Sequence, residues 1–384
     1  MENNKTPKIR FKGFTDPWEQ RKFGDVGSVA MCKRIFKEQT SDEGDVPFYK
    51  IGTFGGEPDA YISQELFDEY KAKYPFPNKG DILISASGSI GRTVEFTGEN
   101  EYFQDSNIVW LKHGKDIDNS FLKILYNVVE WSCEGSTIKR LYNDNFLKTE
   151  FMLPNIDEQK KIGEYFCSLD NLITLHQRKY NKLLNVKKSM LEKMFPKNGS
   201  NIPEIRFKGF TDPWEQRKVY EIADRFDNLR VPVAANLRVA GDTPYYGANG
   251  IQDYVDGYTH DGEYVLVAED GASDLKNYPV NYVNGRIWVN NHAHVLQGKN
   301  NIASNRFLSY AISLANIESV LVGGGRAKLN ADVMMNLNID LPTYKEQCRV
   351  AEYFSNLDNL ITLHQRELKK LQNIKKSMHE KMFV

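Results

Sequence analysis

Two stretches of the chain carry apolar side chains at spacings that alternate between four and three residues. In the first stretch the pattern comprises Ile162, Phe166, Leu169, Ile173, His176, Tyr180, Leu183, Lys187, Met190 and Met194. In the second stretch it comprises Val350, Phe354, Leu357, Ile361, His364, Leu368, Leu371, Lys375, Met378 and Met382. Neither stretch contains proline, and a heptad seam of this length predicts a coiled coil. We therefore expect two long helices that pack antiparallel, with the histidines and lysines of the seam fixing their register.

The helical stretches belong to an internal duplication. One repeated pair is 153–195 with 341–383, and a second pair, identical letter for letter, is 9–22 with 205–218. Between the repeats lie two inserts that differ from each other, at 20–152 and 219–340. A duplicated frame around two dissimilar inserts predicts one scaffold that presents two different binding domains.

The order of repeats and inserts divides the chain into six segments. They are a repeat segment at 1–22, a first domain at 20–152, a helix at 153–196, a linker with the second repeat at 197–218, a second domain at 219–340, and a second helix at 341–384. The expected fold class is α+β, with two mixed α/β domains separated by the antiparallel helices and related by a pseudo-twofold repeat. Because identical copies precede two different inserts, we expect Trp18 and Trp214 to be buried in a structural clasp.

Both inserts follow the same plan with different residues. The first reads as a turn into a buried strand at 79–85, a small-residue loop at 86–92, strands at 93–97 and 107–112, and a helix at 119–130. The second reads as a strand at 262–268, a loop at 269–273, strands at 280–283 and 286–289, and a helix at 304–315. A fixed plan with divergent loops is what a pair of sequence-specific DNA-binding domains requires, since loops carry recognition while the scaffold stays constant.

Each insert also contains a basic loop with glycine, at 135–142 and at 323–330. Lysine and arginine neutralise phosphates, and Asn, Ser and Arg side chains hydrogen-bond base edges. The DNA-binding candidates in the first insert are Ser87, Ser89, Arg92, Lys139, Arg140 and Tyr142. Those in the second are Tyr245, Tyr246, Asn249, Asn291, His292, Arg326 and Lys328. The alternative for each loop is an ordinary solvated surface.

Composition limits the remaining possibilities. The chain has 50 Lys and Arg against 51 Asp and Glu, so any nucleic-acid surface must be a local basic patch. No run of eighteen apolar residues occurs, the first residues lack the apolar core of a signal peptide, and the four cysteines form no CxxC pair. These features predict a cytoplasmic protein with reduced thiols and no membrane segment.

Three short patterns imitate catalytic or metal-binding motifs. Pro58-Asp59 followed by Glu69-x-Lys71 has the letters of a metal-dependent nuclease, but Gln64–Lys73 reads as a charged amphipathic helix. Asp242-Thr243-Pro244-Tyr245 is close to the loop of amino-methyltransferases, yet no glycine-rich turn follows a strand nearby. His292-x-His294 lacks an evident third ligand, so we expect both histidines to face solvent or DNA. We expect no catalytic residue, no metal and no bound cofactor in this chain.

The layout resembles the specificity subunit of type I restriction-modification systems. The resemblance is carried by the two Leu-Asp-Asn-Leu-Ile-Thr-Leu-His-Gln-Arg helices, by Lys-Gly-Asp-Ile-Leu-Ile-Ser at 79–85 and by Tyr-Tyr-Gly-Ala-Asn-Gly at 245–250. It implies two target recognition domains that each read one half of a split DNA site. It also implies a helical spacer that docks two methyltransferase subunits, with restriction-translocase subunits joining later. S-adenosylmethionine, ATP and Mg²⁺ would then be bound by those partners.

One departure and two alternatives accompany this resemblance. Glu269 and Asp270 replace the small residues of the first loop, which puts phosphate contacts there in doubt, although an acidic side chain could accept a hydrogen bond from cytosine N4. The alternatives are a coiled-coil adaptor that does not read DNA and a nuclease or methyltransferase.

Overall fold

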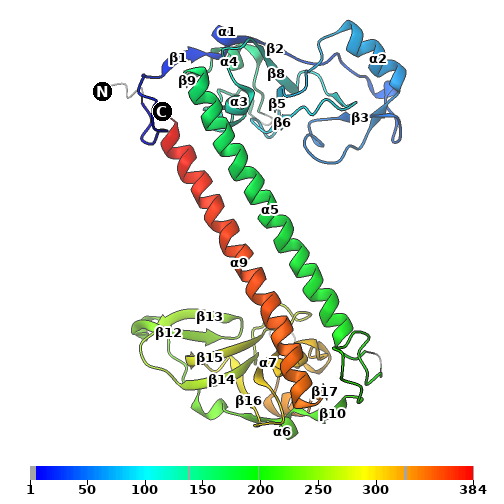
Figure 1. Cartoon of the computed structure of the whole chain (residues 1–384), viewed down its shortest axis with the longest axis vertical. Coiled ribbons are helices and arrows are strands. Elements are labelled where there is room, and N and C mark those ends of the chain that lie inside the picture. Colours follow the sequence, from blue (N-terminus) through cyan, green and yellow to red (C-terminus); the bar gives the residue numbers. More distant parts are fainter. Residues whose placement is uncertain (1–5, 137–138, 198, 324–326, 384) are drawn as a thin grey trace. The chain divides into compact units, whose positions relative to one another are not determined.

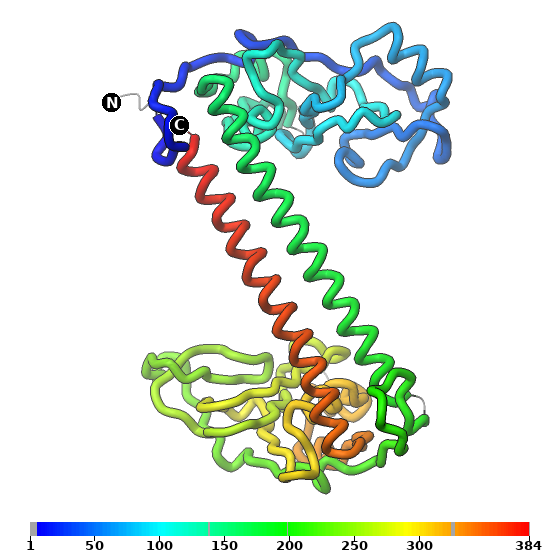
Figure 2. Tube along the Cα trace, in the orientation of Figure 1, coloured from blue at the N-terminus to red at the C-terminus, as the bar shows by residue number. Residues whose placement is uncertain are grey.

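The computed structural model describes residues 6–136, 139–197, 199–323 and 327–383. The chain divides into two compact units, Met1–Gln177 with Arg366–Val384 and Arg178–Gln365. Two continuous helices of 39 residues each, α5 (Ile156–Met194) and α9 (Tyr344–Met382), contribute one half to each unit, as Figures 1 and 2 show.

The first unit contains a four-stranded antiparallel sheet in the order β2-β8-β5-β6. Its strands are β2 (Gly27–Ala30), β5 (Ile82–Ser85), β6 (Thr93–Glu95) and β8 (Ile108–His113). Successive residues of β5 point to opposite faces, so Ile82 and Ile84 enter the core shared with α3 (Asn119–Leu125) and α5, while Leu83 enters a second core. Burial on both faces explains why this strand reads as an unbroken apolar run.

The second core of the first unit is rich in aromatic side chains. It lies between the three-stranded sheet β4-β3-β7 and helix α2 (Gln64–Lys73), with Phe48, Phe67 and Tyr102 almost fully buried. The strands are β3 (Val46–Tyr49), β4 (Tyr61–Ile62) and β7 (Tyr102–Phe103). The short elements that complete the unit are β1 (Glu19–Lys22), α1 (Phe23–Val26), η1 (Lys37–Gln39), α4 (Asn143–Lys148) and β9 (Glu150–Leu153).

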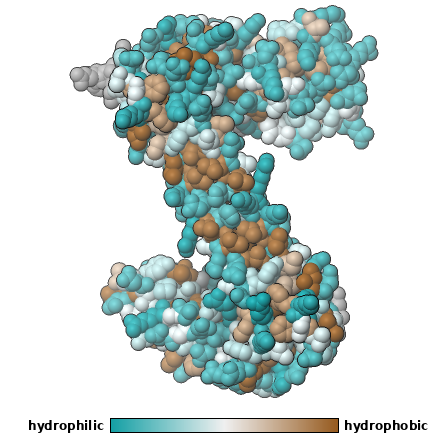
Figure 3. Space-filling view, viewed as in Figure 1, coloured by the Kyte–Doolittle hydropathy of each residue, from teal (hydrophilic) through white to brown (hydrophobic). Residues whose placement is uncertain are grey.

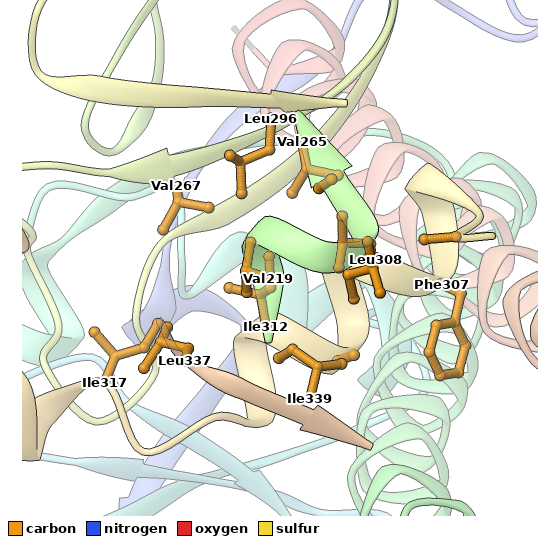
Figure 4. Packing of buried hydrophobic residues seen from close by; sticks show 14 of the residues in the cluster. Val219, Val265, Val267, Leu296, Phe307, Leu308, Ile312, Ile317, Leu337 and Ile339 are labelled. Atoms are coloured by element: carbon orange, nitrogen blue, oxygen red, sulfur yellow. The ribbon is translucent and has the colours of Figure 1, made fainter. Parts of the chain in front are cut away.

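The second unit is built on a six-stranded sheet in the order β11-β16-β14-β15-β12-β13. Its strands are β11 (Ala223–Arg225), β12 (Ala240–Gly247), β13 (Gly250–Val255), β14 (His260–Ala268), β15 (Val280–Val289) and β16 (Ala293–Gly298). Helix α7 (Asn305–Leu314) packs on one face, where Leu308 and Ile312 lie opposite Val265, Val267 and Leu296 (Figure 4). The remaining elements are β10 (Glu215–Lys218), α6 (Val219–Ile222), η2 (Asp227–Leu229), η3 (Ala235–Leu237), η4 (Glu318–Val320), α8 (Ala331–Met335) and β17 (Asn338–Leu341).

Two expected elements differ from those observed. The strands expected at 280–283 and 286–289 form a single strand, β15, because Gly285 at φ +96° pairs in register with Gly262 at φ +140° and the ladder stays continuous there. The helix expected at 119–130 ends at Leu125, and the indole nitrogen of Trp131 donates to the carbonyl of Tyr126 at 3.2 Å. Residues 127–129 keep turn hydrogen bonds to Ile124 and Leu125 instead of continuing the helix, and the rings of Tyr126 and Trp131 lie 5.7 Å apart.

The repeated segment at 9–22 forms the expected clasp in the first unit. Arg10 donates two hydrogen bonds to Glu158 near the start of α5, at 2.6 and 2.7 Å, and Trp18 donates a third at 3.2 Å. The copy in the second unit places Arg206 on Glu346 in the same way, at 2.7 and 2.8 Å. Both tryptophans are buried, Trp18 at 1% and Trp214 at 2% exposure, which confirms the prediction.

The heptad seam is confirmed in both units. In the first unit the early α5 residues Ile162, Phe166 and Leu169 share a core with the late α9 residues Leu371, Met378 and Met382. In the second unit the early α9 residues Val350, Phe354 and Leu357 share a core with the late α5 residues Leu183, Met190 and Met194. Pairing of early with late residues means that the helices pack antiparallel within each unit. Six further predicted seam residues are half-buried, namely Ile173, His176, Tyr180, Ile361, His364 and Leu368.

The seam lysines are paired with aspartates of the facing helix. Lys187 lies 2.5 Å from Asp358 in the second unit, and Lys375 lies 2.5 Å from Asp170 in the first. These two ion pairs occupy equivalent places in the repeat, as expected of polar seam residues that fix register.

His379 is half-buried in the first unit, with one buried ring nitrogen that has no hydrogen-bond partner among the described residues. Its ring packs 4.5 Å from that of Phe166, and Nε2 lacks a hydrogen-bond partner within the described part of the chain. The equivalent position in the second unit is Leu191. We expect His379→Leu to raise the free energy of unfolding by about 1–2 kcal/mol, because an unsatisfied buried donor or acceptor is removed.

This gain should depend on pH. Burial and then the charge of Lys375 lower the pKa of His379 below its ordinary value of 6.5. Since the unfolded chain binds the proton more readily, His379 costs stability as the pH falls below about 6.5. Urea denaturation at pH 5.5 and 7.5 should therefore show a larger gain for His379→Leu at the lower pH. An equal or smaller gain at pH 5.5 would contradict this account of the buried ring.

Candidate nucleic-acid interface

The structure brings together the two loops that the sequence proposes in the first unit. The small-residue loop follows β5, and its Ser87 forms an isolated bridge with Arg140 of the basic loop. Backbone hydrogen bonds join Leu141 to Ala86 at 2.8 Å and Gly88 to Lys139 at 3.3 Å. The two loops therefore form one surface at the end of the central sheet.

The second unit repeats this junction at equivalent positions. Asp270 forms an isolated bridge with Lys328, as Ser87 does with Arg140. The backbone nitrogen of Leu329 donates to the backbone carbonyl of Glu269 at 2.7 Å. The order of elements around the junction is the same in both units, while the side chains differ. A protein that binds two different half-sites needs two surfaces with the same backbone geometry and different side chains.

The side chains of the first junction point toward solvent. Ser89, Lys139 and Arg140 are exposed and Tyr142 is 50% exposed, whereas Ser87 is buried. Arg140 forms no ion pair with any described residue, so its guanidinium is available to an external anion. A pocket of about 670 Å³ next to it is lined by Ser106, Arg140, Tyr142 and Lys148, among others.

Arg92 has a structural role that the sequence did not reveal. Its guanidinium donates to the carbonyl of Ile51 at 2.7 Å and lies 5.5 Å from the ring centre of Phe54. It therefore ties the small-residue loop to the turn at 50–54, which weakens its assignment as a phosphate contact.

The second junction is dominated by an internal ion-pair network. Glu269 accepts from Arg230 at 2.8 Å and from Lys328 at 2.9 Å. Burial alone would raise the pKa of Glu269, but these two hydrogen bonds lower it below its ordinary value. The same bond to Glu269 raises the pKa of Lys328. Lys328 is thus already neutralised, unlike Arg140, and is a weaker candidate for a phosphate contact.

His294 corrects the expectation that both histidines face solvent or DNA. It is buried, and its ring nitrogens lie 2.7 Å from Asp227 and 2.9 Å from the carbonyl oxygen of Leu329. His292 is half-buried, and its Nδ1 lies 2.5 Å from Asp270.

The same network contains a group with the spacing of a metal site. Ligand atoms of Asp227, Glu269 and His294 all lie within 4.8 Å of one another. However, Arg230 and Lys328 bond the carboxylate of Glu269, and both ring nitrogens of His294 face oxygen acceptors. Because these possible ligand atoms already form hydrogen bonds or ion pairs with protein groups, the arrangement favours an ion-pair network over metal binding.

Tyr245 is not available to bases. Its side chain is 1% exposed, its hydroxyl bonds the backbone of Val233, and the guanidinium of Arg238 lies 4.1 Å from its ring centre. It serves instead to support the loop at 229–239. Tyr246 is half-buried against the sheet.

The remaining candidates of the second unit are more accessible. Asn249 and Asn291 are exposed, and the side chain of Asn249 bonds the backbone of Gly271 and Ser273 at 2.9 and 2.8 Å. Asn249 therefore links the turn between β12 and β13 to the loop at 269–273. Arg326 lies outside the described residues.

Sequence reasoning missed Arg230, which pairs with Glu269 together with Lys328. Arg230 lies 39 positions before Glu269, in a segment without periodic pattern, so spacing gives no signal for their pairing. The two carboxylates of the nuclease-like pattern also have partners that the sequence did not reveal. Asp59 pairs with Lys50 at 2.9 Å, and Glu69 pairs with Lys73 at 2.9 Å. Helix α2 matches the charged amphipathic helix expected there.

Among the described helices, none combines the length and the apolar character that a membrane crossing demands.

The fold and the two junctions define a class of protein, a duplicated helical scaffold that presents two different recognition-type domains. Residues 15–185 and 211–373 both match the family model described as "Type I restriction modification DNA specificity domain". The two matches together cover most of the chain, and the chain belongs to this family.

Individual relatives agree with this assignment. A putative type I restriction enzyme specificity subunit, S.HindORF215P of Haemophilus influenzae, is 58% identical over 156 residues, which are 39% of this chain and 40% of that protein. The type I restriction enzyme MjaVIII specificity subunit of Methanocaldococcus jannaschii is 22% identical over 337 residues, which are 78% of this chain and 75% of that protein. The crystal structure of a type I restriction-modification S subunit from M. genitalium has a similar fold, with a TM-score of 0.71, 16% identity and 99% coverage of both chains.

Proposed function

We propose that the chain is the DNA specificity subunit of a type I restriction-modification complex, and that each unit reads one half of a bipartite, asymmetric site. The observation that carries this proposal is the junction repeated in both units, where one backbone plan places Ser87 beside Arg140 in one unit and Asp270 beside Lys328 in the other. Because the side chains differ, the two half-sites should differ. The chain itself contributes recognition and assembly, and no catalytic residue.

The long helices provide surfaces on which methyltransferase subunits could dock. Leu172 and Leu175 of α5 are 45% and 46% exposed, and the equivalent Leu360 and Leu363 of α9 are 44% and 52% exposed. Figure 3 shows apolar side chains on the exposed surface of the long helices. Exposed apolar pairs on otherwise polar helices are typical of protein interfaces. We assign one pair to each of two methyltransferase subunits, with restriction-translocase subunits joining the assembly and the complex acting on DNA in the cytoplasm.

In this proposal the cofactors are bound by the partners. S-adenosylmethionine would be held by the methyltransferase subunits, and ATP and Mg²⁺ by the translocase subunits. The sequence supports this division of labour, because a GxxxxGK[ST] phosphate loop does not occur in it.

A selection from random DNA duplexes tests the proposal. The chain is purified with its methyltransferase subunits, and bound duplexes are sequenced after several rounds. We expect one motif with two defined halves and an undefined spacer. Binding without any enriched sequence would support an adaptor that does not read DNA.

The basic loop of the first unit gives a prediction at a single residue. We expect Arg140→Ala to weaken binding to the selected duplex by about tenfold and to reduce the slope of log K against log salt by about 0.9, as for the loss of one phosphate contact. Fluorescence anisotropy at several salt concentrations measures both quantities. Lys328→Ala is the matched comparison and should reduce the slope less, since Lys328 is bound to Glu269. Unchanged slope and affinity for Arg140→Ala would remove that residue from the interface.

A further inference from the structure

The second half of each long helix is strongly basic. Residues 178–194 of α5 include six Lys or Arg and one acidic residue, and residues 366–382 of α9 include six Lys or Arg and two acidic residues. The first halves are acidic by comparison, with two basic and four acidic residues at 156–177 and two basic and three acidic residues at 344–365. In a chain with a net charge of −1, each of these two segments is a local concentration of basic side chains.

Part of the basic charge forms one ordered stripe on each helix, which we call the outer stripe. It comprises Arg178, Lys182, Asn185 and Lys188 on α5, and Arg366, Lys370, Asn373 and Lys376 on α9. The spacings of four, three and three residues place the members on one face, away from the heptad seam. All eight side chains are exposed.

The outer stripe does not help the helices to fold. Its lysines and arginines form no ion pair with the residues that the structure describes, in contrast to the seam lysines Lys187 and Lys375. Arg178 and Lys182 are four positions apart, as are Arg366 and Lys370, and like charges at this spacing destabilise a helix. A self-repelling stripe that is present in both copies therefore indicates an external anionic partner.

In the second unit the outer stripe adjoins the recognition surface. A groove of about 650 Å³ is lined on the α5 side by Asn185 and Lys188, and on the domain side by Lys276 and Asn277. Lys276 follows the loop at 269–273 along the chain, and Asn249 ties that loop to the turn between β12 and β13. The groove therefore brings Lys276, three residues after the loop, close to Lys188 of the outer stripe, while Glu192 and Glu318 also line it.

We propose that the outer stripe of each unit binds backbone phosphates of the duplex DNA that adjoins the half-site held by that unit. Lysine and arginine side chains neutralise phosphates, and an asparagine amide can donate to a phosphate oxygen, without reading sequence. Such contacts suit a bipartite site, because DNA beside a half-site must be held whatever its sequence. This inference rests on the function proposed above.

The test removes three charges from one outer stripe. The variant Arg178→Gln, Lys182→Gln, Lys188→Gln is purified with the methyltransferase subunits, and its affinity for the selected duplex is measured by fluorescence anisotropy from 0.05 to about 0.3 M KCl. We expect the slope of log K against log salt to fall by up to about 2.7, or 0.9 for each phosphate contact, and affinity near 0.15 M salt to fall about 10- to 100-fold. The selected motif should stay the same.

A control variant and a modified duplex separate this stripe from general electrostatics. Lys160→Gln, Lys161→Gln, Lys345→Gln removes three exposed charges from the first halves of the helices and should change the slope by less than about 1. A duplex with uncharged methylphosphonate linkages beside the half-site should reduce the slope of the unaltered assembly, and should reduce that of the triple outer-stripe variant much less.

Two results would overturn the proposal while leaving the specificity function intact. One is an outer-stripe variant that binds the motif with the slope and affinity of the unaltered assembly. The other is an outer-stripe variant that no longer associates with the methyltransferase subunits, which would make the stripe a protein contact. If the unaltered assembly selects no motif, both the specificity function and this inference are wrong.

Discussion

Replacement of Glu158 by alanine should destabilise the first unit by about 3–5 kcal/mol, because it leaves a largely buried arginine without its partner. The side chain of Glu158 is 0% exposed and that of Arg10 is 13% exposed, and their bidentate hydrogen bond raises the pKa of Arg10. Trp18 would also lose its acceptor. Urea denaturation followed by tryptophan fluorescence measures the change.

The duplicated frame offers a matched comparison for this prediction. Glu346→Ala removes the same partner from Arg206 in the second unit, but the indole nitrogen of Trp214, unlike that of Trp18, has no hydrogen-bond partner among the described residues, so the loss of stability should be smaller. Glu164→Ala changes an exposed residue of α5 and should cost less than about 0.5 kcal/mol. A loss below about 1 kcal/mol for Glu158→Ala would show that the clasp contributes little to stability.

Insertion of one heptad into both long helices should change the DNA spacer and leave both half-sites unaltered. A heptad after Leu183 and another after Leu371 keep the seam in phase and lengthen each helix by about 10.5 Å. That length corresponds to about three base pairs at a rise of about 3.4 Å. We therefore expect the methylated motif to keep its halves and to gain a spacer longer by this amount.

The control for the heptad variant is an insertion that also lengthens the helices but moves the seam residues off the face that contacts the other helix. A three-residue insertion at the same two places breaks the alternation of four and three and should abolish assembly or DNA binding. Genome-wide sequencing of N6-methyladenine distinguishes the outcomes. Altered half-sites, or an unchanged spacer in a stable heptad variant, would show that the helices do not measure the site.

The parts of the fold with a strong repeating pattern could be predicted from the sequence. The heptad seam gave the long helices and their antiparallel packing, since Phe166 and Phe354 are completely buried where the period places them. Local patterns also gave α2 and α7 almost to the residue. These elements are determined by contacts that recur at fixed spacing, which a single sequence displays directly.

Elements determined by contacts between distant residues could not be predicted. The shortened α3 depends on the indole of Trp131, and the continuous β15 depends on the pairing of Gly285 with Gly262. Gly163 in α5 is a further case, because a side chain there would collide with Ser120 of α3, whereas the second unit has Ala351 at this position. None of these partners lies within the window over which a pattern can be read.

The candidate site was predicted in part for the same reason. The sequence identified the loops of each insert but not their contact, and the structure places each pair side by side, with Arg140 exposed beside Ser87. The chemistry of individual side chains was less predictable, because burial and ion pairing decide it. Tyr245 has the composition of a base contact but supports a loop, and His294 belongs to a buried network.

A comparison of methylomes tests the central claim most directly. The methyltransferase subunit is expressed with and without this chain in a host that lacks adenine methylation, and N6-methyladenine is read genome-wide by single-molecule sequencing. We predict one split, asymmetric motif that appears only when this chain is present, with one half altered when residues 20–152 are exchanged and the other when residues 219–340 are exchanged. A stable complex that methylates no defined motif, or a motif that is the same without the chain, would contradict the account.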